Sequence, residues 1–177
     1  MNKLLIMCEG PNEKAIIEML LDAEQLIFTR NDLLGLVPYH ARQLTLPAVV
    51  TNLNLYTGSI DVLRVGDTLN DVLKIPKEYR EKINSVRKYC TKPELEMLFV
   101  IAEGLDKEFD KIKSSKKPKQ FCKEKVKYHR KKYDNSTQFY WEYFGDDIDK
   151  LVSAIKIYKQ THGAHDKDEG YLADLLK

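Results

Sequence analysis

Two stretches near the start of the chain have the hydrophobic pattern of buried strands. Residues 3–8, KLLIMC, form a compact apolar run that ends at Glu9, and residues 60–65 form a second run that ends in a Gly-Asp turn containing Asp67. Short apolar runs bounded by turn residues are typical of strands inside a sheet. An acidic residue therefore follows each of two predicted strands.

The segments between these strands have helical spacing. Pro11 suits the first turn of a helix, and the apolar residues that follow recur every three or four positions as far as Leu20. Residues 46–56 repeat this pattern, and residues 36–41 are a candidate further strand. Alternating strands and helices predict an α/β fold.

Beyond residue 76 the pattern predicts helices. Residues 98–112 suit one long amphipathic helix that tolerates Gly104, residues 119–133 a basic helix, and residues 148–155 and 171–176 two more. We therefore divide the chain into an α/β core, residues 1–110, and a basic, helical C-terminal elaboration packed on it, residues 111–177.

Charge is concentrated in one segment. Residues 107–133 contain twelve Lys or Arg against three acidic residues, whereas the whole chain has a net charge of +2. Such a run is either a solvated face or a surface for nucleic-acid phosphates. We expect DNA or RNA as a partner, and the candidate phosphate contacts are Lys116, Lys117, Lys119, Arg130, Lys131 and Lys132.

Aromatic residues permit two interpretations. Phe121, Tyr128 and Tyr133 lie within the basic segment, where they either stack on the bases of a single strand or pack in the interior. Residues 138–144, QFYWEYF, contain the only Trp, and core or interface packing is the favoured interpretation for them.

Other classes of protein lack their signatures. The sequence contains no P-loop, dinucleotide fingerprint or serine-hydrolase elbow. Its three cysteines suggest reduced thiols, and no apolar run approaches the length of a membrane span. We expect a cytoplasmic protein that does not associate with membranes.

The run IMCEGPNE resembles the first motif of the topoisomerase-primase (TOPRIM) domain, in particular its small TOPRIM-like and OLD-family nuclease versions. The resemblance implies a mainly parallel, Rossmann-like sheet flanked by helices. It also implies that Glu9 is catalytic, either as a ligand of Mg²⁺ or Mn²⁺ or as a general acid or base on a phosphodiester. Small proteins of this kind resemble components of mobile elements or phage defence.

The second family motif, Asp-x-Asp, corresponds to the segment IDVLRVGDTLND. Asp67 matches the leading acid and is implied to be a catalytic metal ligand, whereas Leu69 occupies the place of the second. Asp71 is a candidate substitute ligand, and Glu94 a candidate helper at the start of a helix. The implied activity is metal-dependent nucleic-acid binding or nuclease-like phosphodiester processing.

Two alternatives come from other classes of function. In the first alternative, the chain is a non-catalytic module that binds nucleic acid or protein and has a degenerate metal site. Leu69 favours this alternative. In the second alternative, the chain is an interaction protein that uses the aromatic residues 138–144 for self-association. A homodimer or a complex with a protein partner is then expected.

Overall fold

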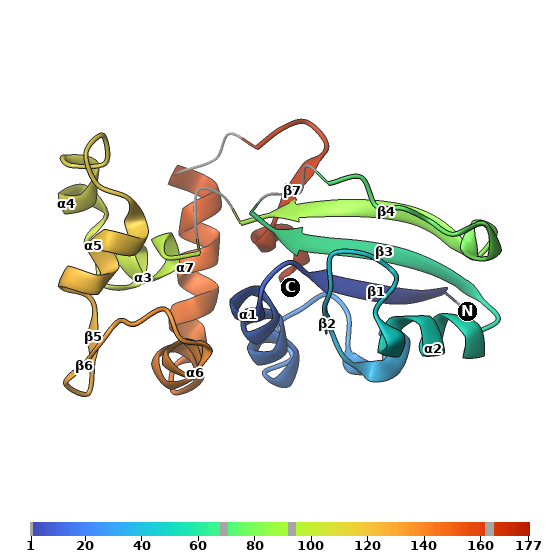
Figure 1. Cartoon of the computed structure of the whole chain (residues 1–177). Helices are drawn as coiled ribbons and strands as arrows, with labels where there is room; N and C mark the ends of the chain where they lie inside the picture. Colours follow the sequence, from blue (N-terminus) through green and yellow to red (C-terminus); the bar gives the residue numbers. More distant parts are fainter. Residues whose placement is uncertain (1, 68–70, 92–94, 162–164) are drawn as a thin grey trace.

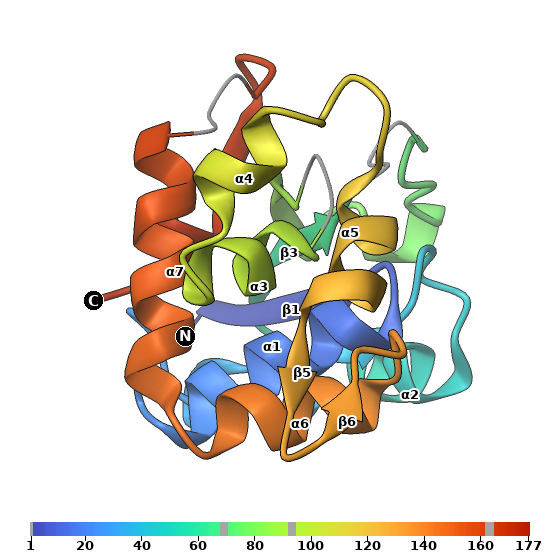
Figure 2. The same cartoon turned by 90° about the vertical axis from the view of Figure 1, so that its left-hand side faces the viewer.

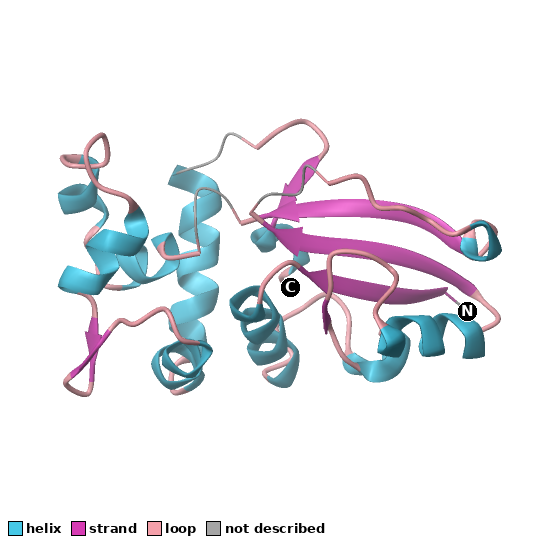
Figure 3. Ribbon diagram, in the orientation of Figure 1, coloured by secondary structure: helices cyan, strands magenta, loops and turns pink. Residues whose placement is uncertain are grey.

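A computed structural model describes residues 2–67, 71–91, 95–161 and 165–177. Its main sheet has five strands, all paired in parallel, in the order β2-β1-β3-β4-β7 (Figure 3). The strands are β1 (Asn2–Cys8), β2 (Tyr39–His40), β3 (Ser59–Gly66), β4 (Ile83–Cys90) and β7 (Glu169–Tyr171). This confirms the predicted α/β fold with a mainly parallel sheet flanked by helices.

Seven α-helices and a small antiparallel hairpin complete the described elements. The helices are α1 (Pro11–Asp22), α2 (Pro47–Leu55), α3 (Met97–Ala102), α4 (Asp106–Asp110), α5 (Pro118–Lys125), α6 (Thr137–Gly145) and α7 (Ile148–Thr161). The hairpin pairs β5 (Lys127–Tyr128) with β6 (Lys131–Lys132). Short 3₁₀ helices span Arg30–Asp32, Leu34–Leu36, Lys77–Tyr79 and Leu172–Leu175.

The two faces of the sheet bury different helices. Side chains alternate along a strand, so Ile6 and Cys8 of β1 face α1 and the C-terminal helices, whereas Leu5 and Met7 lie in the cluster that includes α2. Both sets of side chains are almost fully buried. The apolar run predicted as an interior strand therefore serves both hydrophobic clusters.

Helices α3 to α7 lie beyond the carboxyl ends of β1, β3 and β4 (Figures 1 and 2). Phe99 of α3 lies at the centre of this part, with its ring centroid 4.7–5.7 Å from the aromatic rings of Tyr133, Phe139, Tyr140, Tyr143 and Phe144. The expected core packing of residues 138–144 is confirmed for four aromatics, and Trp141 remains 39% exposed. Residues in this helical part thus form one wall opposite the strand ends.

Three predictions about the second half of the chain are wrong. Residues 83–90 form β4 rather than a helix; the strand lacks an apolar run, and only its last residue, Cys90, is buried. The long helix is broken at Gly104, which has φ +67° and donates to Ile101 O (2.9 Å), while Leu105 donates to Val100 O (2.9 Å). This is a Schellman-type helix end, which favours glycine.

The predicted basic helix ends early as well. Helix α5 stops at Lys125, because Val126 has extended backbone angles and a completely buried side chain. The next residues form the hairpin β5-β6. Phe121 and Tyr133 are buried, so neither ring can stack on a base in this conformation of the protein.

Cys8, Cys90 and Cys122 are free and buried. Among the described helices, none is both long and apolar enough to cross a membrane.

Candidate acidic cleft at the carboxyl ends of the strands

Glu9 and Asp67 follow two neighbouring parallel strands. Glu9 comes directly after β1 and Asp67 directly after β3, and the backbone N–H of Glu9 donates to Val65 O (2.8 Å). The carboxyl ends of parallel strands are the usual location of ligand sites in open α/β sheets. The fold therefore places both acids at the edge where such a site would form.

The Glu9 side chain lies across the end of β3. A Cβ at Gly66 would collide with the Glu9 side chain, so the absence of a side chain at position 66 makes room for it. The Glu9 carboxylate is only 8% exposed and pairs with Arg42, with 3.2 Å between Oε1 and Nη2. Glu9 is thus buried and already has a cationic partner.

Between the strand ends and the helical part lies a cleft with a volume of about 240 Å³, which we call the acidic cleft. It is lined by Asn12, Glu13, Asp67, Leu95, Glu96, Lys119, Asn135 and Tyr140. Three of these side chains are carboxylates and one is a lysine. The lining combines the first turn of α1, the end of β3 and three segments of the helical part.

Glu13 is an acid of this cleft whose pKa is strongly shifted. Its pKa is raised from about 4.5 to about 7, mainly by burial and in addition by the negative charges of Asp67, Glu9 and Glu96, against a hydrogen bond from its own backbone that lowers it. Three neighbouring carboxylates therefore act on Glu13. Sequence analysis missed Glu13 as a site residue, although its position four residues after Glu9, in the first turn of a helix, was an available signal.

Glu96 forms the opposite wall and is 7% exposed. Its carboxylate accepts a hydrogen bond from the Tyr133 hydroxyl (2.9 Å), which lies 3.4 Å from the Tyr140 hydroxyl. Burial is the main reason that the pKa values of both tyrosines lie well above the ordinary value, and the Glu96 charge adds to it. Both tyrosines therefore stay protonated around the buried carboxylate.

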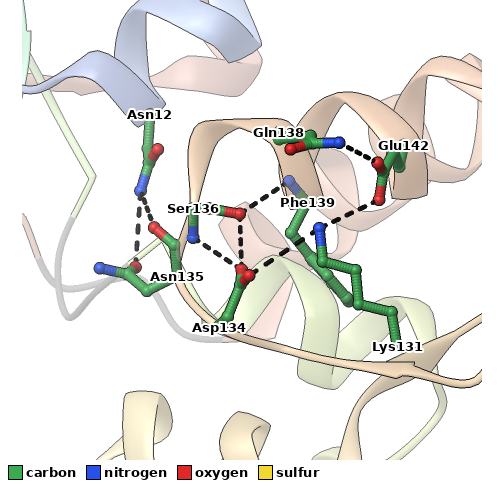
Figure 4. A network of polar contacts seen from close by, with 8 residues as sticks. All are labelled: Asn12, Lys131, Asp134, Asn135, Ser136, Gln138, Phe139 and Glu142. Atoms are coloured by element: carbon green, nitrogen blue, oxygen red, sulfur yellow. Dashed lines mark hydrogen bonds and ion pairs between the residues drawn. The ribbon is translucent and has the colours of Figure 1, made fainter.

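Asn135 connects the acidic and basic sides of the cleft. With its amide nitrogen toward Glu96, it donates to Glu96 Oε1 (3.1 Å) and accepts from Lys119 Nζ (2.9 Å), the orientation that satisfies both neighbours. Asn12 donates to the Asn135 backbone carbonyl (3.3 Å) and accepts from the Thr137 hydroxyl (2.8 Å). The first turn of α1 is thus tied to the loop before α6 (Figure 4).

That loop is itself held rigidly. Asp134 accepts from the Ser136 backbone N–H (2.9 Å) and from its hydroxyl (2.6 Å), and the Ser136 hydroxyl oxygen accepts from Phe139 N (3.1 Å) at the start of α6 (Figure 4). A serine N-cap of this kind satisfies a helix amide that would otherwise lack a partner. Asn135 is therefore presented to the cleft from a fixed turn.

The remaining predicted site residues have different positions. Asp71 is exposed, does not line the acidic cleft, and uses its backbone carbonyl to accept a hydrogen bond from the buried Arg64. Glu94 lies outside the described residues, as does Leu69. Glu96, two residues further along the chain than Glu94, lines the cleft.

The six predicted phosphate contacts lie in or just before α5 and in the hairpin. Lys119 lines the acidic cleft, Lys116 pairs with Glu124 (2.6 Å), and Lys117 is exposed just before α5. The other three, Arg130, Lys131 and Lys132, belong to the hairpin rather than to a helix. Lys131 pairs with Glu142 (3.3 Å).

The donor set can be compared with the needs of a metal ion. Carboxylate oxygens are the ligands that Mg²⁺ prefers, and a cation would relieve the repulsion that raises the Glu13 pKa. Within the described ranges, however, no three His, Cys, Asp or Glu side chains are grouped closely enough to hold an ion. The cleft fits a hydrated ion bound through one or two carboxylates, not an ion caged by protein alone.

Comparisons of this chain with family models, with curated proteins and with solved structures find no match. The fold and the site define an α/β protein with a parallel sheet and a carboxylate-lined cleft at its carboxyl edge. The residues of that cleft are therefore the basis for proposing a function.

Proposed function

We propose that the acidic cleft binds a divalent cation of the Mg²⁺ type together with a phosphodiester of DNA or RNA, and that the protein is a TOPRIM-like enzyme that processes this bond. The observation that carries the proposal is the raised pKa of Glu13 at the cleft, near the carboxylates of Glu9, Asp67 and Glu96. Perturbed acids in a cleft are candidates for function, because structural positions seldom concentrate like charges.

Each group in the cleft has a proposed role. Asp67 and Glu9 would hold the ion, which when bound supplies positive charge to the phosphate oxygens. Lys119 would contact a non-bridging phosphate oxygen, since its amine lies on the far side of the cleft, beside Asn135. Glu13, with a pKa of about 7, would accept or release a proton at neutral pH.

Glu96 has a positioning role in this scheme. Its carboxylate is fixed by the Tyr133 hydroxyl and faces the same cleft as Asp67. A buried, hydrogen-bonded carboxylate loses little freedom when a ligand binds. The buried, free cysteines and a nucleic-acid substrate both agree with a cytoplasmic setting.

A second candidate function is a non-catalytic module that binds nucleic acid or protein. The observation in its favour is the ion pair between Glu9 and Arg42 (3.2 Å), which already neutralises the first proposed ligand. Under this alternative Glu9 is a structural turn residue and the cleft binds no metal ion.

Calorimetric titration of Mn²⁺ distinguishes the two candidates. We expect the wild type to bind the ion, and Asp67→Asn and Glu9→Gln each to weaken binding by about tenfold or more. Glu78→Gln is the matched control, because Glu78 is exposed on the 3₁₀ helix before β4. A cleavage assay on single- and double-stranded DNA and RNA, with the same variants, tests the chemical step.

The outcomes separate clearly. Metal binding and cleavage that are lost together in Asp67→Asn support the enzyme. An absence of Mn²⁺ binding by the wild type, even with nucleic acid present, would overturn the metal site and leave the binding module.

A further inference from the structure

The hairpin formed by residues 127–132, KYHRKK, is the most basic element of the described structure, and we call it the basic hairpin. Strands β5 and β6 pair only with each other, through Lys127 with Lys132 and Tyr128 with Lys131. The turn between them consists of His129 and Arg130. Isolated two-stranded hairpins are marginally stable in water.

Local physics disfavours this hairpin in two ways. His129 and Arg130 have φ values of +44° and +70°, a region that β-hairpin turns normally fill with Asn or Gly. Lys127 lies directly opposite Lys132, and like charges at opposed positions destabilise a strand pair. Violations of local rules concentrated in one exposed element indicate a function that compensates for them.

Contacts at the base hold the hairpin in place. The Tyr128 hydroxyl donates to Asp146 beyond α6, and Lys131 pairs with Glu142 (3.3 Å). By contrast Lys127, Arg130 and Lys132 are exposed, and in the part of the chain that the structure describes no carboxylate lies within ion-pair distance of them. Three cations are therefore presented to solvent on an anchored support.

The basic hairpin leads directly into the acidic cleft. Tyr133, the next residue, donates to Glu96, and Asn135 lines the cleft. Asn135 lies five positions after Arg130 in the sequence, so the tip of the hairpin lies at most about 18 Å from the cleft. One nucleic acid can thus contact both.

We propose that the basic hairpin enters the major groove of duplex DNA while a phosphodiester of the same duplex lies at the acidic cleft; this rests on the proposed function. The major groove of B-form DNA admits a two-stranded ribbon, whereas that of A-form RNA is too narrow and deep. Anionic phosphates on both sides of the groove would also screen the repulsion between Lys127 and Lys132.

The nearby aromatics favour a duplex over a single strand. Single-strand binding uses exposed rings that stack on bases. Tyr133 and Phe121 are buried, and Tyr128 is held by Asp146. Trp141 on the outer side of α6 is the exposed exception, so it serves as the probe for single-strand binding.

Fluorescence anisotropy with the full chain tests the proposal, using a labelled DNA duplex of about two helical turns, one of its strands, and an RNA duplex of the same sequence. The test variant replaces Lys127, Arg130 and Lys132 with Gln. The matched control replaces Lys77, Arg80 and Lys156 with Gln, since these are exposed residues of the same types outside the hairpin.

We expect the wild type to prefer the DNA duplex. The test variant should lose about tenfold or more in affinity for the duplex. The magnitude of the slope of log binding constant against log salt concentration should decrease by about 2 to 3, as expected for three lost phosphate contacts. The control should change affinity by less than about threefold. Lys132→Thr should weaken duplex binding without loss of folding, because it removes a cross-strand repulsion.

Several results would overturn the proposal. These are equal affinities of test and control variants, a wild type that binds none of the probes, a preference for RNA duplex, and a preference for single-stranded DNA that Trp141→Ala removes. Mn²⁺ titration of the same test variant separates the two proposals. If the test variant loses duplex binding but keeps metal binding, the hairpin binds the duplex independently of the metal site. If duplex binding depends on the hairpin but the wild type binds no metal ion, only the proposed enzyme is overturned.

Discussion

The hydroxyl of Tyr133 donates a hydrogen bond of 2.9 Å to the carboxylate of Glu96, across 37 residues of sequence. Tyr133 directly follows the basic hairpin, and Glu96 directly precedes α3, the first helix of the helical part that faces the strand ends. The bond therefore fixes the most basic element of the protein to the wall of its acidic cleft. Both groups are buried, so neither can exchange this partner for bulk water.

Tyr133→Phe should destabilise the protein by about 1–3 kcal/mol, because it removes a donor from a buried carboxylate. Urea unfolding measures the change. A double-mutant cycle with Glu96→Gln should give a coupling energy above about 0.5 kcal/mol. Additive effects of the two substitutions would show that the bond contributes nothing of its own.

Glu13 should make stability depend on pH. Because its pKa rises from about 4.5 to about 7 on folding, the folded protein retains a proton that the unfolded chain has lost between these values. Its contribution is fully present below about pH 4.5 and is lost as the pH rises through about 7. Stability should therefore fall over this interval, by roughly 1–3 kcal/mol after solvent screening.

Urea unfolding at about pH 5 and about pH 8 tests this expectation. Glu13→Gln should flatten the difference, whereas Glu78→Gln, at an exposed position, should not. If the cleft binds Mg²⁺, its addition should restore stability to the wild type at the higher pH. An unchanged pH dependence in Glu13→Gln would assign the effect to other groups.

Gly66→Ala should be strongly destabilising for its size. The new Cβ would meet the Glu9 side chain, which is confined between β3 and Arg42. We expect a loss of about 1–3 kcal/mol in the free energy of unfolding. Gly145→Ala is the matched control, since the nearest atom to its Cβ is 3.9 Å away, and it should be neutral or mildly stabilising at the end of α6.

The turn of the basic hairpin should accept a better sequence. Replacing His129 with Asn and Arg130 with Gly suits the positive φ values of both positions, so the free energy of unfolding should increase by about 0.5–1 kcal/mol. Thermal unfolding measures the gain. A decrease would mean that these side chains make stabilising contacts of their own.

Sequence analysis predicted the first half of the sheet because its elements have strong local patterns. Strand β1 and helix α1 bury regular apolar positions, and the predicted interior strand at residues 60–65 is confirmed as part of β3. Strand β4 escaped detection because only Cys90 of its residues is buried, since β7 covers residues 88–90 alone. Periodicity carries little information in such a strand.

The prediction of a basic helix over residues 119–133 failed for a different reason. Lysine favours helices, so residues 119–133 resemble a basic helix, and the hairpin turn contains neither Asn nor Gly to indicate otherwise. At the cleft, the positions of Glu9 and Asp67 follow from local order along the chain. The approach of Glu96, Asn135 and Lys119 depends on tertiary packing, which a single sequence does not reveal.

The link from Asn12 to Asn135 and Thr137 has a consequence for heating. One wall of the cleft belongs to the sheet and the other to the helical part, so a partly open state in which the two separate would keep its secondary structure and lose the cleft. Cooperative units often open below the global transition. On heating, ligand binding would then be lost at a lower temperature than the far-ultraviolet circular dichroism signal. The difference between these two midpoint temperatures would measure how strongly the sheet and the helical part are held together.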